Sequence, residues 1–302
     1  MHPQAASFVA SYPSDLGVDP ATLDLDAIRR MRAQDGFALQ RGPKPRLFSV
    51  RDEVAEQVPI RIYRADAEQD ARPVVVYFHG GGWVFGSVKR NDALGRDLAL
   101  RTGAVVVSVD YRLAPEHPFP AAADDAWSVV RDIFARPAFY QGNGSVAVVG
   151  DSAGGNLAAV AAWQARDAGL QLAHQVLIYP VTDVAMETAS YREYASGFGL
   201  DAAEMAWFAR QYAAGADPDD PRLSPLRLKD FAGLPSATVV TAECDVLRDE
   251  GELYGARLAE AGVPVEVRRF EGAVHSFYAL PGFFDQAAQA REYVAARLQE
   301  AL

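Results

Sequence analysis

The stretch that decides the fold is residues 145–167, which read SVAVVGDSAGGNLAAVAAWQARD. The apolar, mostly β-branched run Val146–Val149 predicts a strand buried on both faces, and the alanine-rich run after it predicts a helix. Between them, Gly150–Gly154 form a G-x-S-x-G pentapeptide, whose glycines relieve the crowding of a sharp strand-to-helix turn. Such a turn exposes the Ser152 hydroxyl beside the free N–H groups of a helix N-terminus. The pentapeptide alone predicts either a nucleophile or a structural turn.

Apolar runs that predict strands alternate with helical runs along most of the chain. The further buried strands are expected at Val74–Phe78, Ala104–Val109, Gln175–Tyr179, Ala237–Thr241 and Val265–Phe270. This alternation predicts βαβ units with right-handed crossovers, and a parallel sheet with a site at the C-terminal ends of its strands. Arg46–Val50 and Val58–Tyr63, separated by the polar Arg51–Gln57, predict an antiparallel hairpin at the sheet edge.

Two segments fall outside this alternation. Val181–Pro221 contain many aromatic residues and no strand pattern. We interpret this insertion as a helical lid over the site; the alternative is a core helix that packs on the sheet. Residues 1–42 have helical spacing at Ala21–Arg32, with Asp19 as the N-cap and Pro20 in the first helical position.

The composition limits the protein's class and partners. The chain has 302 residues, of which 50% are hydrophobic and 23% charged, and no repeat or linker divides it, so we expect a single domain over residues 1–302. A net charge of −11 disfavours a nucleic-acid partner, and no apolar run is long enough for stable membrane insertion. The first residues lack the pattern of a secretory signal, and the single Cys244 allows neither a disulfide within the chain nor a cysteine metal site. We therefore expect a cytoplasmic protein.

A second glycine-rich segment, His79–Trp83, follows the buried strand Val74–Phe78. Three consecutive glycines let a backbone approach another group closely, and in acyl transfer that group is the substrate oxyanion. A flexible surface loop is the alternative. A phosphate-binding loop is disfavoured, because no G-x-G-x-x-G or Gly-Lys-Ser/Thr pattern is present.

A serine nucleophile needs a base, and that base needs an orienting group. The chain has five histidines: His2, His79, His117, His174 and His275. Only His275 follows the last strand at the expected edge of the sheet, so we predict it as the base. For the acid we favour Asp245, a few residues past Ala237–Thr241. The rivals are Glu243, Asp249 and Glu250 in the same loop and Asp183 after the preceding strand.

The motifs together resemble those of a known family. They are His79–Trp83, Tyr111–Glu116, Gly150–Gly155, Asp245–Gly251 and His275–Phe277. In this order they are similar to the motifs of bacterial hormone-sensitive-lipase-like carboxylesterases of the α/β-hydrolase fold, from about Arg72 to the C-terminus. The resemblance implies a mostly parallel, eight-stranded sheet flanked by helices. It also implies a helical cap formed by about residues 1–42 and 184–220, and homodimers through an edge such as Val265–Phe270 or the first hairpin.

The resemblance further implies a role for each site residue. Ser152 would be the nucleophile, His275 the general base and acid, and Asp245 the carboxylate that orients it. The N–H groups of Gly81, Gly82 and Ala153 would form the oxyanion hole, and no metal or cofactor is implied. Two positions depart from the family's pattern, since Val246 stands where proline is frequent and Ser276 where glycine is usual.

The aromatic residues near these motifs predict the substrate class. We expect an apolar acyl pocket formed by Trp83, Phe85, Phe198, Trp207 and Phe208. The predicted function is hydrolysis of short- to medium-chain acyl esters through an acyl-enzyme intermediate. The alternatives are hydrolysis of a related bond, such as a lactone, thioester, carbamate or amide, and a non-catalytic ligand-binding receptor on the same fold. The presence of His275 disfavours the receptor.

Overall fold

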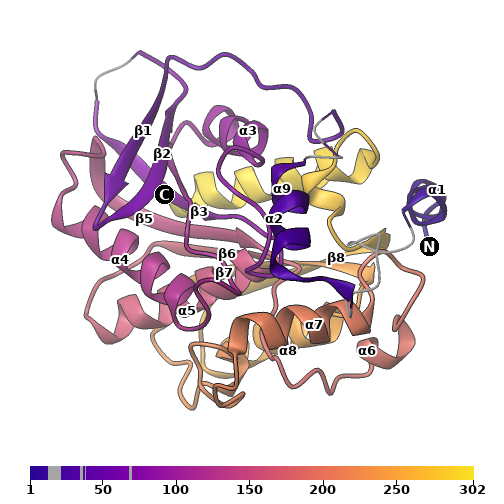
Figure 1. The fold of residues 1–302 in the computed structure, drawn as a ribbon. Helices are drawn as coiled ribbons and strands as arrows, with labels where there is room; N and C mark the ends of the chain where they lie inside the picture. The colour runs from indigo at the N-terminus through magenta and orange to yellow at the C-terminus, as the bar shows by residue number, and fades with distance from the viewer. Residues whose placement is uncertain (13–21, 35–36, 38, 68–69) are drawn as a thin grey trace.

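The computed structural model describes residues 1–12, 22–34, 37, 39–67 and 70–302. The described chain folds around one eight-stranded sheet in the order β1-β2-β4-β3-β5-β6-β7-β8 (Figure 1). The strands are β1 (Ser49–Ala55), β2 (Val58–Arg64), β3 (Arg72–Phe78), β4 (Val105–Val109), β5 (Gly142–Asp151), β6 (His174–Ile178), β7 (Ser236–Cys244) and β8 (Val265–Val274). β2 pairs antiparallel with β1 and β4, and the other neighbours are parallel. The predicted mostly parallel sheet with an edge hairpin is confirmed.

The strand β5 lies near the middle of the sheet, and its apolar run explains this position. Its residues Val146–Asp151 are all buried, as are all residues of the neighbouring β6. A strand covered on both faces needs side chains that can be buried on both, and continuous valine and alanine meet this need. The sequence therefore places the residue after β5, Ser152, at the centre of one edge of the sheet.

The first strand differs from the sequence prediction. We expected it at Arg46–Val50, whereas β1 spans Ser49–Ala55 and takes in most of the polar run that was assigned to a connection. The turn is only two residues long, Glu56 and Gln57, which have φ values of +48° and +73°. β1 is an edge strand with several exposed side chains, so its polar residues face solvent and hid the strand from the apolar pattern.

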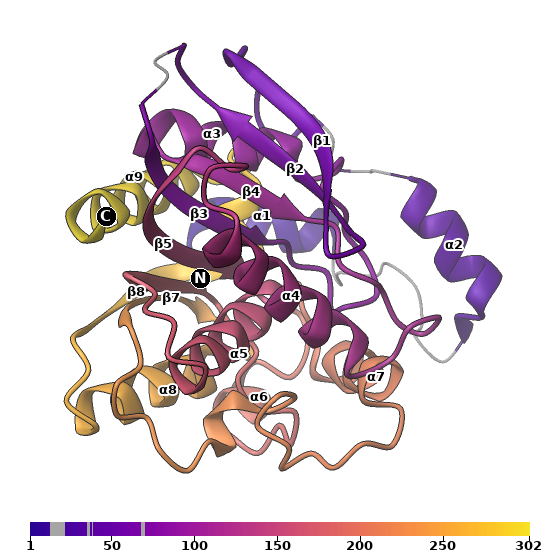
Figure 2. The ribbon, with the colours of Figure 1, turned by 90° about the vertical axis from the view of Figure 1, so that its left-hand side faces the viewer.

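Helices cover both faces of the sheet (Figures 1 and 2). One face carries α3 (Asp92–Thr102) and α9 (Asp285–Ala301), and the other carries α4 (Ala121–Ala135), α5 (Ala153–Asp167) and α8 (Arg248–Glu260). α5 lies against β5 and α4, and it is buried along most of its length. Its small alanine side chains allow this close approach.

Four further helices come from the two segments outside the alternation. They are α1 (Pro3–Ser11), α2 (Leu25–Ala33), α6 (Ser190–Glu193) and α7 (Ala202–Ala213), and the short 3₁₀ turns η2 (Pro225–Arg227) and η3 (Phe277–Ala279) complete the set described. Asp24 caps α2, because its carboxylate accepts the Ala27 N–H at 2.7 Å, so this helix begins later than expected. The expected cap residues Asp19 and Pro20 lie outside the described residues. α2 and α7 lie on the same side of the molecule (Figures 1 and 2).

None of the helices described is both long and apolar enough to cross a membrane.

Candidate active site

The turn between β5 and α5 holds Ser152 in an unusual backbone conformation. Its φ and ψ are +57° and −120°, a region that residues with a side chain rarely adopt. A Cβ atom on Gly150 would lie 2.0 Å from the Gly154 carbonyl oxygen, and one on Gly154 would lie 2.0 Å from that of Phe78. Glycine is therefore required at both positions. The turn presents the Ser152 hydroxyl at the end of the strand, directly before the N-terminus of α5.

Three side chains from different elements form a hydrogen-bonded chain. The His275 Nε2 lies 3.0 Å from the Ser152 Oγ, and its Nδ1 lies 2.7 Å from the Asp245 Oδ2. A carboxylate can only accept, so Nδ1 carries the proton, and the Ser152 hydroxyl donates to Nε2. The other oxygen of Asp245 accepts the Leu247 N–H at 3.0 Å. This is the arrangement in which an imidazole can remove a proton from a serine.

The rival carboxylates have other partners. The Glu243 side chain accepts the Gly272 N–H, and Asp183 pairs with Arg227 at 2.8 Å. Asp249 accepts the Ser190 N–H at 2.8 Å, and the fully buried Glu250 accepts the Thr182 N–H at 2.7 Å. The described contacts of these four carboxylates hold backbone segments and arginines, while Asp245 contacts His275.

The rival histidine His174, which was expected to flank a strand, begins β6. Its ring nitrogens lie 2.7 Å from the Ser236 hydroxyl and 2.9 Å from the Thr238 hydroxyl. Burial lowers the pKa of His174 to about 4. This histidine stays neutral and holds two strands together.

The glycine run forms a tight, ordered turn beside Ser152. Gly81 and Gly82 have φ values of +123° and +60°. The Gly81 carbonyl accepts the Phe85 N–H at 2.8 Å, and a Cβ atom on Gly82 would lie 2.2 Å from the ring of Phe208. The alternative of a flexible surface loop does not fit this packing. Gly80, Gly81 and Gly82 line the same cavity as Ser152, and Ala153 begins α5, where backbone N–H groups have no partner within the helix.

Asp151 braces the glycine turn, a role that the sequence reasoning missed. Its Oδ1 accepts the Tyr77 hydroxyl at 2.6 Å and the Gly80 N–H at 3.1 Å. Burial raises the pKa of Asp151 above its usual range. Asp151, directly before Ser152, therefore joins this serine to the turn that carries the expected oxyanion donors. The sequence signal that could have indicated this role is the position of Asp151 inside the Gly150–Gly154 pentapeptide.

Tyr111, from the Tyr111–Glu116 motif, also supports this turn. Its hydroxyl donates to the His79 carbonyl at 2.7 Å, and its ring stacks on the His79 ring at 4.3 Å. Burial lowers the pKa of His79 and so favours a neutral ring there. The motif thus has a structural purpose near the site.

A cavity of about 270 Å³ opens onto Ser152 and His275. Leu200, Met205 and Phe208 from the insertion line one part of it. The described residues of the N-terminal segment that line it are Met31, Gln34, Phe37 and Arg41. Both irregular segments therefore contribute to the cavity wall. Those N-terminal residues were not predicted, because nothing in their spacing tied them to the site.

The expected aromatic pocket needs correction. Phe85 and Phe208 line the cavity, whereas Trp83, Phe198 and Trp207 are not among the residues that line it. Trp83 is fully buried and stacks on Tyr212 at 4.5 Å. Trp207 stacks on Phe85 at 6.3 Å, and Phe198 packs edge-on against Tyr194. Trp207 therefore packs behind Phe85, while the described ring contacts of Trp83 and Phe198 are to residues that do not line the cavity.

Within the described residues, no group of three or more histidine, cysteine, aspartate or glutamate side chains is arranged to hold a metal ion.

Comparison with known proteins places this geometry in a family. Residues 75–279 match the family model described as the alpha/beta hydrolase fold. The chain is 41% identical over 251 residues to carboxylesterase NlhH of Mycobacterium tuberculosis, covering 81% of this chain and 79% of that protein. It is 38% identical over 252 residues to an ethyl acetate hydrolase of Pseudomonas putida, with the same two coverages.

Solved structures agree with the sequence relatives. An esterase of Pyrobaculum calidifontis superimposes with a TM-score of 0.89 at 38% identity, covering 99% of this chain and 98% of that one. The motifs, the sheet and the relatives thus point to one conclusion. The chain belongs to the α/β-hydrolase family, and within it to the hormone-sensitive-lipase-like carboxylesterases that its motifs resemble.

Proposed function

We propose that Ser152 attacks the carbonyl carbon of a carboxylic ester and forms an acyl-enzyme. His275 takes the proton of the hydroxyl and then delivers it to the departing alcohol. In the second half of the reaction His275 activates a water molecule, which releases the acid and regenerates Ser152. The single observation that carries this proposal is the position of the His275 ring, within hydrogen-bond distance of both Ser152 and Asp245.

The carbonyl oxygen becomes an anion during each attack. We assign its stabilisation to the N–H groups of Gly81, Gly82 and Ala153. The first two belong to a turn fixed by Asp151 and by contact with Phe208, so they need no rearrangement when charge develops. Loss of one such donor typically costs about 10²–10³ in rate.

The cavity supports a substrate with a short or medium acyl chain. Its volume is about 270 Å³, and Met205 and Phe208 line it together with Ser152. The name of the Pseudomonas relative, ethyl acetate hydrolase, describes a protein that acts on a small ester. The same machinery fits lactones, thioesters and carbamates, so a related bond is the second candidate.

The two irregular segments act together as a cap in this proposal. Residues from 1–42 and from 184–220 both line the cavity, and their helices α2 and α7 lie on one side of the molecule (Figure 2). We extend the proposal to a single catalytic domain carrying this cap. The cytoplasmic location and a homodimer stay predictions, and light scattering coupled to gel filtration tests the dimer.

The experiment compares hydrolysis of p-nitrophenyl esters, from acetate to palmitate, by the wild type and by Ser152→Ala. We expect turnover that peaks at short or medium chains and falls on the order of 10⁶-fold in the variant. Turnover that survives in a folded Ser152→Ala protein would show that another residue is the nucleophile. A rate that keeps rising beyond about twelve carbons, as each CH₂ adds about 0.8 kcal/mol of burial, would contradict the proposed pocket.

A further inference from the structure

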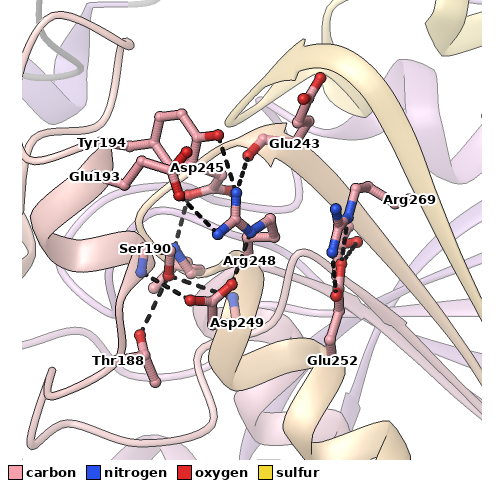
Figure 3. A network of polar contacts seen from close by, with 12 residues as sticks. Thr188, Ser190, Glu193, Tyr194, Glu243, Asp245, Arg248, Asp249, Glu252 and Arg269 are labelled. Carbon is pink, nitrogen blue, oxygen red and sulfur yellow. Dashed lines mark hydrogen bonds and ion pairs between the residues drawn. The ribbon is translucent and has the colours of Figure 1, made fainter.

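The turn that carries Asp245 is joined to the insertion by side chains that do not line the cavity (Figure 3). Asp245 follows β7 and is connected to α8 by only Val246 and Leu247. The Leu247 N–H donates to its Oδ1, so the direction of the carboxylate depends on where this short turn lies. The turn must hold that direction for the other oxygen to meet His275.

Arg248 lies at the centre of the contacts that hold this turn. Its Nε donates to the Asp249 Oδ1 at 2.7 Å, and its Nη2 donates to the Glu193 Oε2 at 3.0 Å. Its Nη1 donates to the Tyr194 hydroxyl at 2.9 Å and to the Glu243 carbonyl at 3.3 Å. The guanidinium therefore joins residues on both sides of Asp245 to the end of α6.

The backbone and packing of Arg248 strengthen this link. Its own N–H donates to the Asp245 carbonyl at 3.2 Å, and the guanidinium lies over the Tyr194 ring at 5.0 Å from its centroid. The side chain is only 11% exposed, so its contacts are poorly screened by water. A bidentate or forked guanidinium fixes several partners in one geometry, which a surface ammonium does not.

Ser190, the first residue of α6, makes a second link to the same turn. Its hydroxyl donates to the Val246 carbonyl at 2.6 Å and lies 3.3 Å from the Asp249 N–H, from which it accepts. Its N–H donates to the Asp249 Oδ2. We call the set Ser190, Glu193, Tyr194, Arg248 and Asp249 the α6 clamp.

We propose that Arg248 is a positioning residue for the catalytic acid, and that through the α6 clamp the insertion fixes the direction of the Asp245 carboxylate. The proposal rests on the proposed function, in which Asp245 orients His275. Arg248 itself touches neither His275 nor Ser152 in the contacts described. Substitution of Arg248 should therefore lower the rate of the chemical step, and by the same factor for esters with different acyl groups.

The chain offers a matched control for this test. Arg269 makes an equally close pair with Glu252, at 2.6 and 2.8 Å, on the neighbouring surface of β8 and α8 (Figure 3). The contacts described for Arg269 do not reach the Asp245 turn. Arg269→Gln removes a guanidinium–carboxylate pair of the same kind and leaves the hydrogen bonds of the α6 clamp in place.

The experiment measures kcat and KM of Arg248→Gln, Arg248→Lys and Arg269→Gln with p-nitrophenyl acetate and hexanoate. A shift of about 1 Å in a catalytic group can cost about 10²-fold, so we expect Arg248→Gln to lose about 10- to 100-fold in kcat. The loss should be the same for both esters, with KM unchanged. Arg248→Lys keeps the charge and should regain part of kcat, and Arg269→Gln should stay within about twofold of the wild type.

Two results would overturn the proposal. One is a folded Arg248→Gln enzyme with kcat within about twofold of Arg269→Gln. The other is a loss that appears in KM or differs between the two esters, because that would place the effect in the pocket. Should Arg248→Gln fail to fold, Ser190→Ala and Glu193→Gln decide by the same criteria, since Glu193 is 54% exposed and its substitution removes only one partner of the clamp.

The activity of Asp245→Asn distinguishes a failure of this proposal from a failure of the proposed function. If Asp245→Asn is nearly inactive while Arg248→Gln is fully active, the assignment of the catalytic triad holds. Only the positioning role proposed for Arg248 and the α6 clamp is then wrong. If Asp245→Asn keeps full activity, the assignment of the acid itself fails, and with it the reason for positioning that residue.

Discussion

Ser152 and Asp245 lie at the ends of two parallel strands of one sheet, yet they are held by different kinds of contact. Ser152 follows β5, between β3 and β6, and its own backbone is fixed: its N–H donates to the Ile178 carbonyl at 2.9 Å, and its carbonyl accepts the Val181 N–H at 3.2 Å. Asp245 follows β7, next to the edge strand β8, and the side chains of Arg248 and Ser190 bind the backbone on either side of it.

The difference teaches where the site can tolerate change. Around Ser152 the glycines touch backbone atoms at distances that leave no room for a methyl group. Around Asp245 the contacts are hydrogen bonds and ion pairs that can be weakened one at a time. Substitutions near Ser152 should therefore act in an all-or-none manner, whereas those near Asp245 should give graded losses.

The largest effect near the acid is expected from Asp245→Asn. An amide at this position favours the wrong proton arrangement on His275, and in a triad of this kind the change costs about 10⁴ in kcat. The measurement is steady-state hydrolysis of p-nitrophenyl acetate, with circular dichroism to show that the fold is kept. Asp183→Asn is the control, because Asp183 pairs with Arg227 and should lower kcat by less than about threefold. Equal losses in the two variants would contradict the assignment of the acid.

Gly82→Ala tests the glycine turn. A Cβ atom there would meet the Phe208 ring, and its φ of +60° strains any residue with a side chain, so the donors should shift and kcat should fall by about 10²–10³. Gly103→Ala is the matched control. Gly103 has a similar φ of +68° but open space around its Cβ position, so it carries the backbone strain without the clash. A Gly82→Ala enzyme as active as Gly103→Ala would remove the case for donors in this turn.

The pH dependence of kcat/KM tests the role of His275 as the base. A protonated imidazole cannot accept the Ser152 proton, so kcat/KM should fall as the pH drops through roughly 6–7, the range in which imidazoles take up a proton. The described contacts of the ring include Ser152, Asp245 and Tyr179, whose ring centroid lies 4.6 Å away, and the Asp151 carboxylate interacts with the ring electrostatically. Asp151→Asn should lower the rate but keep this acid limb. A profile that is flat down to about pH 5 would contradict this role for His275.

The smallest effect is expected at Ser276, next to the base. This residue has a φ of +65° where the family usually has glycine. Ser276→Gly removes the cost of the left-handed conformation but adds chain entropy in the unfolded state, and the two effects are each about 1 kcal/mol. The free energy of unfolding in urea should therefore change by less than about 1 kcal/mol, with kcat within about twofold. A larger loss of activity would mean that the serine side chain itself takes part in the site.

The sequence was informative where the residues that determine a feature are close together in the chain. Gly150–Gly154 predicted the strand-to-helix turn and the position of Ser152 at its tip, because a residue in a strained turn needs glycines within a few positions of itself. The order of the strands placed Asp245 and His275 at the right edge of the sheet. The structure brings all three side chains together.

The sequence was less informative where tertiary packing determines which side chains line the cavity. Met205 and Phe208 are three positions apart on α7 and line the cavity, while Trp207 lies on another face of the same helix and packs behind it. Aromatic content alone could not show which face turns inward, although the helical spacing of these residues could have separated the faces. The contacts of Arg248 join segments more than 50 residues apart. No local pattern predicts such contacts.

The most direct test of the account is to treat the protein with diethyl p-nitrophenyl phosphate and map the modified residue by mass spectrometry. The phosphorus centre imitates the tetrahedral stage of ester hydrolysis and reacts only with an activated nucleophile. The account predicts one diethyl phosphate per chain, on Ser152, released p-nitrophenol in equal amount and complete loss of esterase activity. Modification of a different residue, or full activity after Ser152 has been modified, would contradict it.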